Sequence, residues 1–106
     1  MAKLPPFDIE YVRSARGDLS TFDVFIRREI LDSIELHLRH QPTVETSRVK
    51  RMRPNPVGLW ELRIGDYRAI YNVDEDLRLV TIKVIGEERG NNLFVQGREY
   101  HDHESD

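Results

Sequence analysis

Three side chains near the middle of the chain have the types and the spacing to act on a phosphate group. Arg63, Arg68 and Glu61 come from two short runs in which apolar and polar residues alternate. Gly65-Asp66 stands between the runs and is typical of a two-residue β-hairpin turn. This turn predicts a register in which Arg63 lies directly opposite Arg68. Like charges in such a pair repel each other by roughly 0.2–1 kcal/mol, which favours an anion or a carboxylate between them.

The predicted pair suits a phosphate anion because guanidinium groups bind phosphate oxygens in parallel. We therefore take Arg63 and Arg68 as candidate catalytic cations, with Lys83 on the same face of the next predicted strand. Metal-free cleavage of RNA also needs a base and an acid. Glu61 is the candidate base, and the sequence names no acid. In the alternative interpretation Glu61, Asp66 or another carboxylate neutralises the arginines and the group is structural.

A second set of cations precedes the hairpin. Lys50, Arg51 and Arg53 are candidates for holding a nucleic-acid backbone, together with Lys83 and Arg89. The whole chain has a net charge of −3, but residues 48–68 contain six Lys/Arg and two Asp/Glu, a local charge of +4. Phosphate recognition depends on the local field rather than on the total. The alternative is that the cluster is a solvated loop.

Hydrophobic periodicity predicts the elements that position these residues. Residues 7–11 alternate as in a first strand. Ser20 resembles an N-cap with Asp23 three residues later, and the following pattern predicts an amphipathic helix of about 18–20 residues that ends before Pro42. The apolar stripe of this helix consists of Phe22, Ile26, Ile30, Ile34 and Leu38, with Phe25 and Leu31 beside it.

The second half of the chain predicts a sheet. Residues 41–58 form a connector, a three-strand meander follows from residue 60, and Gly86 ends its last strand. Residues 92–100 form a further short strand or helix. One face of the meander is expected to pack on the helix and carries Trp60, Leu62, Ile64, Tyr67, Ala69, Tyr71, Val73, Val80, Ile82 and Val84. The sequence thus predicts one α+β domain over residues 1–106, with 1–6 and 101–106 flexible.

Several classes of protein are disfavoured by what the sequence lacks. It contains no cysteine, which fits a reducing cytoplasm. No apolar run reaches the roughly 20 residues of a membrane span, and the first residues lack the apolar region of a signal peptide. No Gly-rich phosphate loop and no metal-ligand spacing occurs. We therefore expect a cytoplasmic protein without a cofactor, a bound metal or a membrane partner.

The stretch from Arg53 to Asp74 resembles the RelE/ParE superfamily of toxins from bacterial type II toxin–antitoxin systems. The similar motif is Trp60-Glu-Leu-Arg63, a tight turn, and Tyr67-Arg68-Ala-Ile-Tyr71. The resemblance covers roughly residues 7–100 and implies a small RelE-like α+β domain with a cognate antitoxin as partner. It also implies a ribosome-dependent, metal-free mRNA endoribonuclease that inhibits translation, with the ribosome and mRNA as further partners.

Four positions depart from the pattern of the best-known nucleases of this superfamily. Glu61 stands where a lysine occurs, Glu87-Glu88 follow Gly86 where basic residues occur, and Phe94 stands near a position often held by a catalytic tyrosine. Two alternatives therefore remain open. One is a non-enzymatic, ParE-like inhibitor of DNA gyrase, and the other is a degenerate module that only binds an antitoxin.

Overall fold

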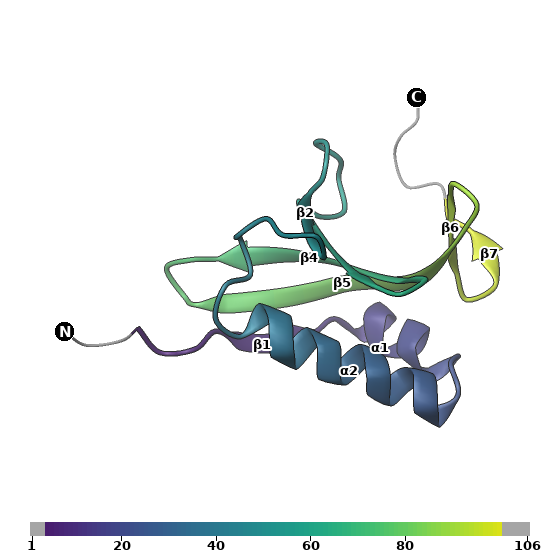
Figure 1. Ribbon diagram of the computed structural model, residues 1–106, viewed down its shortest axis with the longest axis horizontal. Coiled ribbons are helices and arrows are strands. Elements are labelled where there is room, and N and C mark those ends of the chain that lie inside the picture. The colour runs from purple at the N-terminus through teal and green to yellow at the C-terminus, as the bar shows by residue number, and fades with distance from the viewer. Residues whose placement is uncertain (1–3, 101–106) are drawn as a thin grey trace.

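The computed structural model describes residues 4–100 and contains two helices and seven strands in that range. The elements follow in the order β1 (Asp8–Tyr11), α1 (Arg13–Ser20), α2 (Val24–Leu38), β2 (Val49–Arg51), β3 (Trp60–Ile64), β4 (Tyr67–Asp74), β5 (Leu79–Arg89), β6 (Asn92–Val95) and β7 (Arg98–Glu99). Figure 1 shows both helices on one face of the sheet. The predicted α+β architecture is confirmed, whereas the expected flexibility of residues 1–3 and 101–106 lies outside the described residues.

The strands form one mostly antiparallel sheet with the order β2-β3-β4-β5-β6-β7. Strand β1 joins it by pairing in parallel with the first half of β5. The predicted meander is therefore the centre of the sheet, and the segments before and after it add the edges. No helix among the described residues is long and apolar enough to cross a membrane.

The helical region begins differently from the prediction. Residues 13–20 form a helix of their own that runs through Gly17, and the Ser20 hydroxyl donates to the Gly17 carbonyl at 2.7 Å. The N-cap of α2 is Asp23, whose carboxylate accepts from the Ile26 N–H at 3.0 Å. The prediction of Ser20 as N-cap was therefore wrong, because Ser20 is the last residue of α1 and its hydroxyl is bonded within that helix. Helix α2 has 15 residues and ends at Leu38.

The core lies between α2 and the sheet. Ile30, Ile34 and Leu38 are fully buried on one side of α2, and Phe22 and Ile26 are partly buried against the same cluster. The sheet contributes its predicted packed face, including Trp60, Leu62 and Tyr71. Phe25 does not share this stripe, since 82% of it is exposed.

The β3–β4 hairpin has the predicted register. Arg63 lies opposite Arg68, and the four neighbouring pairs from Trp60–Tyr71 to Ile64–Tyr67 also agree. Gly65, the first turn residue, has a φ of +57°, whereas Asp66, the second, has no positive φ. This combination is that of a type II′ turn. The turn therefore sets which residues of β3 and β4 share a face.

A bulge in β5 changes the predicted alternation. Tyr71 pairs with Ile82 and Ile70 pairs with Val84, so Lys83 is the extra residue. Beyond this point Ile85 joins the core and Val84 faces away from the helices with Ile70. The prediction of Val84 on the packed face was wrong for this reason.

Two boundaries of the sheet also differ from the prediction. The connector contains strand β2, which pairs with β3 but is too short to show a period of two. Strand β5 continues through Gly86 to Arg89. A Cβ atom on Gly86 would lie 2.6 Å from the Phe94 carbonyl oxygen, so this glycine allows β6 to approach closely and does not end the strand.

Candidate functional site

The sheet face away from the helices carries most of the predicted site, and we call it the open face. Its charged residues on β3, β4 and the end of β5 are Glu61, Arg63, Arg68 and Glu88. Figure 1 shows the loop between β2 and β3 rising on this side, while the end of β5 and strand β6 rise on the same side at the other end of the sheet. The open face thus lies between two raised segments.

The loop of residues 52–59 is held in place by two asparagines. The Asn55 side chain accepts from the N–H groups of Val57 and Gly58 and donates to the Gly58 carbonyl. Asn72 on β4 accepts from the Leu59 N–H at 2.9 Å. A Cβ atom on Gly58 would lie 2.8 Å from Ile70, so the loop covers Ile70, which is 2% exposed.

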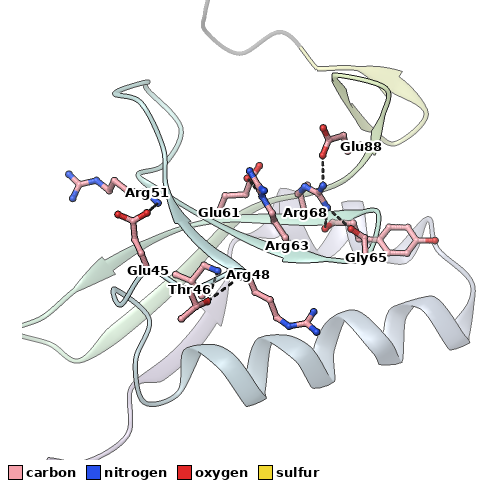
Figure 2. Close-up of polar contacts among 11 residues, drawn as sticks. Glu45, Thr46, Arg48, Arg51, Glu61, Arg63, Gly65, Arg68 and Glu88 are labelled. Carbon is pink, nitrogen blue, oxygen red and sulfur yellow. Dashed lines mark hydrogen bonds and ion pairs between the residues drawn. The ribbon is translucent and has the colours of Figure 1, made fainter.

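The two opposed arginines each have a carboxylate partner. Arg63 pairs with Glu61 on its own strand at 3.3 Å, and Arg68 pairs with Glu88 near the end of β5. Figure 2 shows the two guanidinium groups side by side, with Glu61 on one side and Glu88 on the other. We call these four residues the Arg–Glu quartet. Its formal charge is zero, and it corresponds to the structural alternative considered from the sequence.

Arg68 is the more constrained of the two arginines. Its side chain is 13% exposed, and its Nη1 group donates to the carbonyls of Gly65 at 2.7 Å and Tyr67 at 2.8 Å. Its Nη2 group donates to Glu88. These contacts fix the β3–β4 turn against β5, and the backbone adds a bond from the Glu88 N–H to the Asp66 carbonyl. Arg68 therefore has a structural role in addition to any role in binding.

Arg63 is more available to a partner. Its side chain is 48% exposed, and its contact with Glu61 is long at 3.3 Å. A surface pair of this kind contributes little to stability and opens readily. Arg63 is thus the arginine of the quartet that an incoming group can reach first.

A small pocket lies beside the quartet, between three of its residues and the turn before β6. It has a volume of about 140 Å³ and is lined by Glu61, Arg68, Glu88, Asn91, Asn92 and Leu93. Two carboxylates and one guanidinium give this lining a formal charge of −1. The pocket therefore favours hydrogen-bond donors and cations over a bare phosphate.

The other predicted nucleic-acid ligands are dispersed. Lys50 lies opposite Glu61 and extends the open face, and Lys83 stands at the bulge. Arg51 lies opposite core-facing Trp60 and stacks over its ring at 5.4 Å. Figure 2 shows Arg51 pointing away from the quartet.

Arg53 and Arg89 also lie apart from the quartet. Arg53 is exposed in the 52–59 loop. Arg89 pairs with Glu87 and stacks on Phe94, because it alternates with Glu88 and so faces the other side of β5. The structure therefore brings together Glu61, Arg63 and Arg68, with Lys50 on the same face and Lys83 at the bulge of β5.

Sequence reasoning did not identify Glu88, Asn91 and Asn92 as members of the site. Strict alternation from Val80 and Ile82 would place residue 88 on the packed face. The extra residue at Lys83 moves both Gly86 and Glu88 to the open face. The apolar doublet Val84-Ile85 is the one signal in the sequence that could have indicated this shift.

The tyrosines are poor candidates for the missing acid. Tyr71 is fully buried and donates to the Pro42 carbonyl at 2.6 Å, and burial raises its pKa. Tyr67 lies on the packed face with its ring 5.3 Å from that of Phe22, and burial raises its pKa as well. None of the residues that line the pocket is a histidine, lysine or tyrosine. The ionisable side chains that line the pocket are two glutamates and one arginine.

Comparison with known families agrees with this fold. Residues 9–90, well over half of the chain, match the model of the ParE toxin of the type II toxin–antitoxin system parDE. The chain belongs to the ParE toxin family. As a member of it, the protein is a toxin of a type II toxin–antitoxin system, as the sequence resemblance implied.

A solved structure has the same fold as this ParE-family toxin. It is a chain of the toxin–antitoxin complex RelBE2 from Mycobacterium tuberculosis, with a TM-score of 0.68 and 23% sequence identity. The match covers 78% of the toxin described here and 99% of that chain. At this identity the likeness concerns the fold alone. A search of curated proteins found no match.

Proposed function

We propose that this ParE-family toxin acts by binding a protein target through its open face, as a non-enzymatic inhibitor of the DNA gyrase class. The observation that carries the proposal is the Arg–Glu quartet. Both arginines of the predicted phosphate site already have a carboxylate partner. The ParE family match supplies the toxin role, and the proposal adds a protein target to it.

The electrostatics of the quartet explain why a binding role suits it better than cleavage. A phosphate group between Arg63 and Arg68 would have to displace Glu61 and Glu88 and then remain close to both carboxylates. That repulsion opposes the gain from the guanidinium groups. A protein surface can instead present donors and acceptors together, which matches a face of alternating charge.

A cognate antitoxin completes this proposal. The similar solved structure is a toxin–antitoxin complex, and the family is defined by such systems. We propose that an antitoxin binds this toxin and prevents it from reaching its target. A protein that binds a protein target through one face is blocked simply by covering that face.

An mRNA endoribonuclease is the second candidate. Lys50 and Arg63 lie on the open face and Lys83 stands at the bulge of β5, and these three residues supply cations for an RNA backbone. In this mechanism Glu61 would take the proton from the 2′-hydroxyl after leaving Arg63.

Two assays with the purified toxin distinguish the candidates. We expect inhibition of DNA supercoiling by gyrase and no cleavage of mRNA on translating ribosomes. Arg63→Ala should weaken the inhibition, whereas Arg13→Ala, an exposed arginine on α1, should leave it unchanged. Cleavage of ribosome-bound mRNA with gyrase unaffected would refute the proposal and establish the second candidate.

A further inference from the structure

A buried carboxylate connects the first helix to the far end of the sheet. Asp18 in α1 is 3% exposed, and it is the one charged residue that is buried among the described residues. One carboxylate oxygen accepts from the backbone N–H of Ile85 at 3.0 Å, and the other accepts from the side-chain amide of Gln96 at 2.7 Å. Burial of a carboxylate is unfavourable unless it is hydrogen-bonded. These two contacts therefore account for the presence of a charge at this position.

The sheet has a gap where Asp18 binds. On one edge of β5, strand β1 pairs with Leu79–Ile82 and strand β6 pairs with Glu87–Arg89. Residues 83–86 have no neighbouring strand on that edge. The Ile85 N–H points into the gap, and the Asp18 carboxylate supplies the acceptor that a strand would otherwise provide.

Gln96 ties a second element to the same carboxylate. It stands in the turn of the C-terminal hairpin, which we define as β6 and β7 (residues 92–99). The ladder with β5 holds β6 from Asn92 to Phe94, and Phe94 also approaches Gly86 closely. Asp18 holds the other end of β6, where the turn at Gln96 and Gly97 has positive φ angles.

The C-terminal hairpin contributes to the pocket at the quartet. Asn92 and Leu93 at the start of β6 line it together with Glu61, Arg68 and Glu88. Val95, the turn and β7 lie beyond the ladder with β5, so a hairpin held by this three-residue ladder alone can change its tilt. The position of this pocket wall therefore depends on whether the far end of β6 is fixed.

We propose that Asp18 and Gln96 form a lock that fixes the C-terminal hairpin as a wall of the open face. Asp18 touches the hairpin and β5 but no residue of the quartet, so it acts as a positioning residue. The lock itself is independent of the toxin's target. Its effect on toxicity rests on the proposed function.

An exchange of donor and acceptor tests the lock. Gln96→Glu places two carboxylates at hydrogen-bonding distance, and we expect amide hydrogen exchange at residues 92–95 to rise roughly fivefold to tenfold. Asp18→Asn in the Gln96→Glu background restores one donor and one acceptor, with the new amide oxygen still facing the Ile85 N–H. Exchange should then return to within about twofold of the wild-type rate. Asp18→Asn alone should change little, because the Gln96 amide can rotate.

The control is Gln41→Glu, which adds the same charge at an exposed position and should leave the exchange rates of the hairpin unchanged. Growth inhibition should fall with Gln96→Glu and recover in the double variant. Unchanged exchange in Gln96→Glu, or a double variant that is not restored, overturns the lock. A looser hairpin with full growth inhibition overturns its positioning role. If the wild-type chain does not inhibit growth, the proposed function fails while the exchange rates still decide the lock.

Discussion

Arg68 on β4 and Glu88 on β5 form an ion pair that links the β3–β4 turn to the raised end of β5. Arg68 and Arg63 lie opposite each other in the hairpin, and Glu61 holds the second guanidinium. The repulsion expected from the register is therefore relieved within the chain. The sequence left two explanations open, a bound anion or carboxylates of the chain itself. Carboxylates of the chain already pair with both arginines.

The two arginines should differ in their effect on stability. Arg68→Ala removes two bonds to backbone carbonyls and leaves Glu88 without its partner, so we expect the free energy of unfolding to fall by about 1–3 kcal/mol. Arg63→Ala loses only an exposed pair and should cost at most about 0.5 kcal/mol. Urea unfolding followed by Trp60 fluorescence measures both. Equal costs would contradict the structural role assigned to Arg68.

This difference decides which variant can test function. Because Arg68→Ala is expected to disturb the fold, a loss of toxicity in that variant would not identify a binding residue. Arg68→Lys retains the charge but loses the fork of donors, and it should lie between alanine and wild type in stability. Arg63 is the informative position for binding.

Gly86 and Gly17 should respond in opposite directions to alanine. A Cβ atom at Gly86 would lie 2.6 Å from the Phe94 carbonyl oxygen, so Gly86→Ala should push β6 away and cost about 1–3 kcal/mol. Gly17 lies inside α1, where a Cβ atom would be 3.7 Å from Gln96, an ordinary contact. Gly17→Ala should stabilise the protein by about 0.5–1 kcal/mol. Thermal unfolding of the two variants is the measurement, and a neutral Gly86→Ala would show that β6 approaches less closely.

Tyr71 should make the protein sensitive to alkaline pH. Burial raises its pKa above the ordinary value of 10.0, so the folded state holds the proton when the unfolded state has lost it. The resulting stability is complete below pH 10 and decreases as the pH rises through the raised pKa. Between pH 9 and pH 11 the loss should be about 1 kcal/mol for this one group.

Tyr71→Phe isolates this contribution. The variant loses the bond to Pro42 and should be about 1–2 kcal/mol less stable at pH 8. Its stability should then fall less than that of the wild type between pH 9 and pH 11. Urea midpoints at these pH values test the expectation, and parallel pH profiles would rule out Tyr71 as a source of the alkaline sensitivity. Tyr11, whose pKa burial and the Glu35 charge raise to about 12, remains in both proteins.

The parts of the fold that sequence predicted are those set by local rules. The Gly65-Asp66 turn determined the pairing of Arg63 with Arg68, and alternation placed Trp60 and Tyr71 in the core. The i,i+4 stripe of α2 likewise identified Ile30 and Ile34 as buried. In each case the determining residues lie within a few positions of each other along the chain.

The parts that sequence missed depend on distant contacts. The partner of Arg68 could not be assigned because a single extra residue at Lys83 reverses the face of every later residue in β5. Asp18 and Gln96 are 78 residues apart, and neither has a local pattern that suggests a buried contact. The bulge therefore explains why the sequence predicted a set of cations without Glu88. The long-range hydrogen bond explains why Asp18 and Gln96 were not identified.

Association of the cognate antitoxin with the toxin should depend on charge. Arg51 and Arg53 are exposed around the 52–59 loop, outside the charge-neutral quartet. They provide a positive field for an acidic segment. We expect Arg51→Glu with Arg53→Glu to slow association by roughly tenfold at low salt and to leave dissociation nearly unchanged. Surface plasmon resonance from low to high salt measures both rates. Arg13→Glu with Arg16→Glu, a double reversal on α1, is the matched control. An association rate that is independent of salt and of all four substitutions would place the antitoxin's first contact on an apolar surface, such as the exposed side of α2 around Phe25.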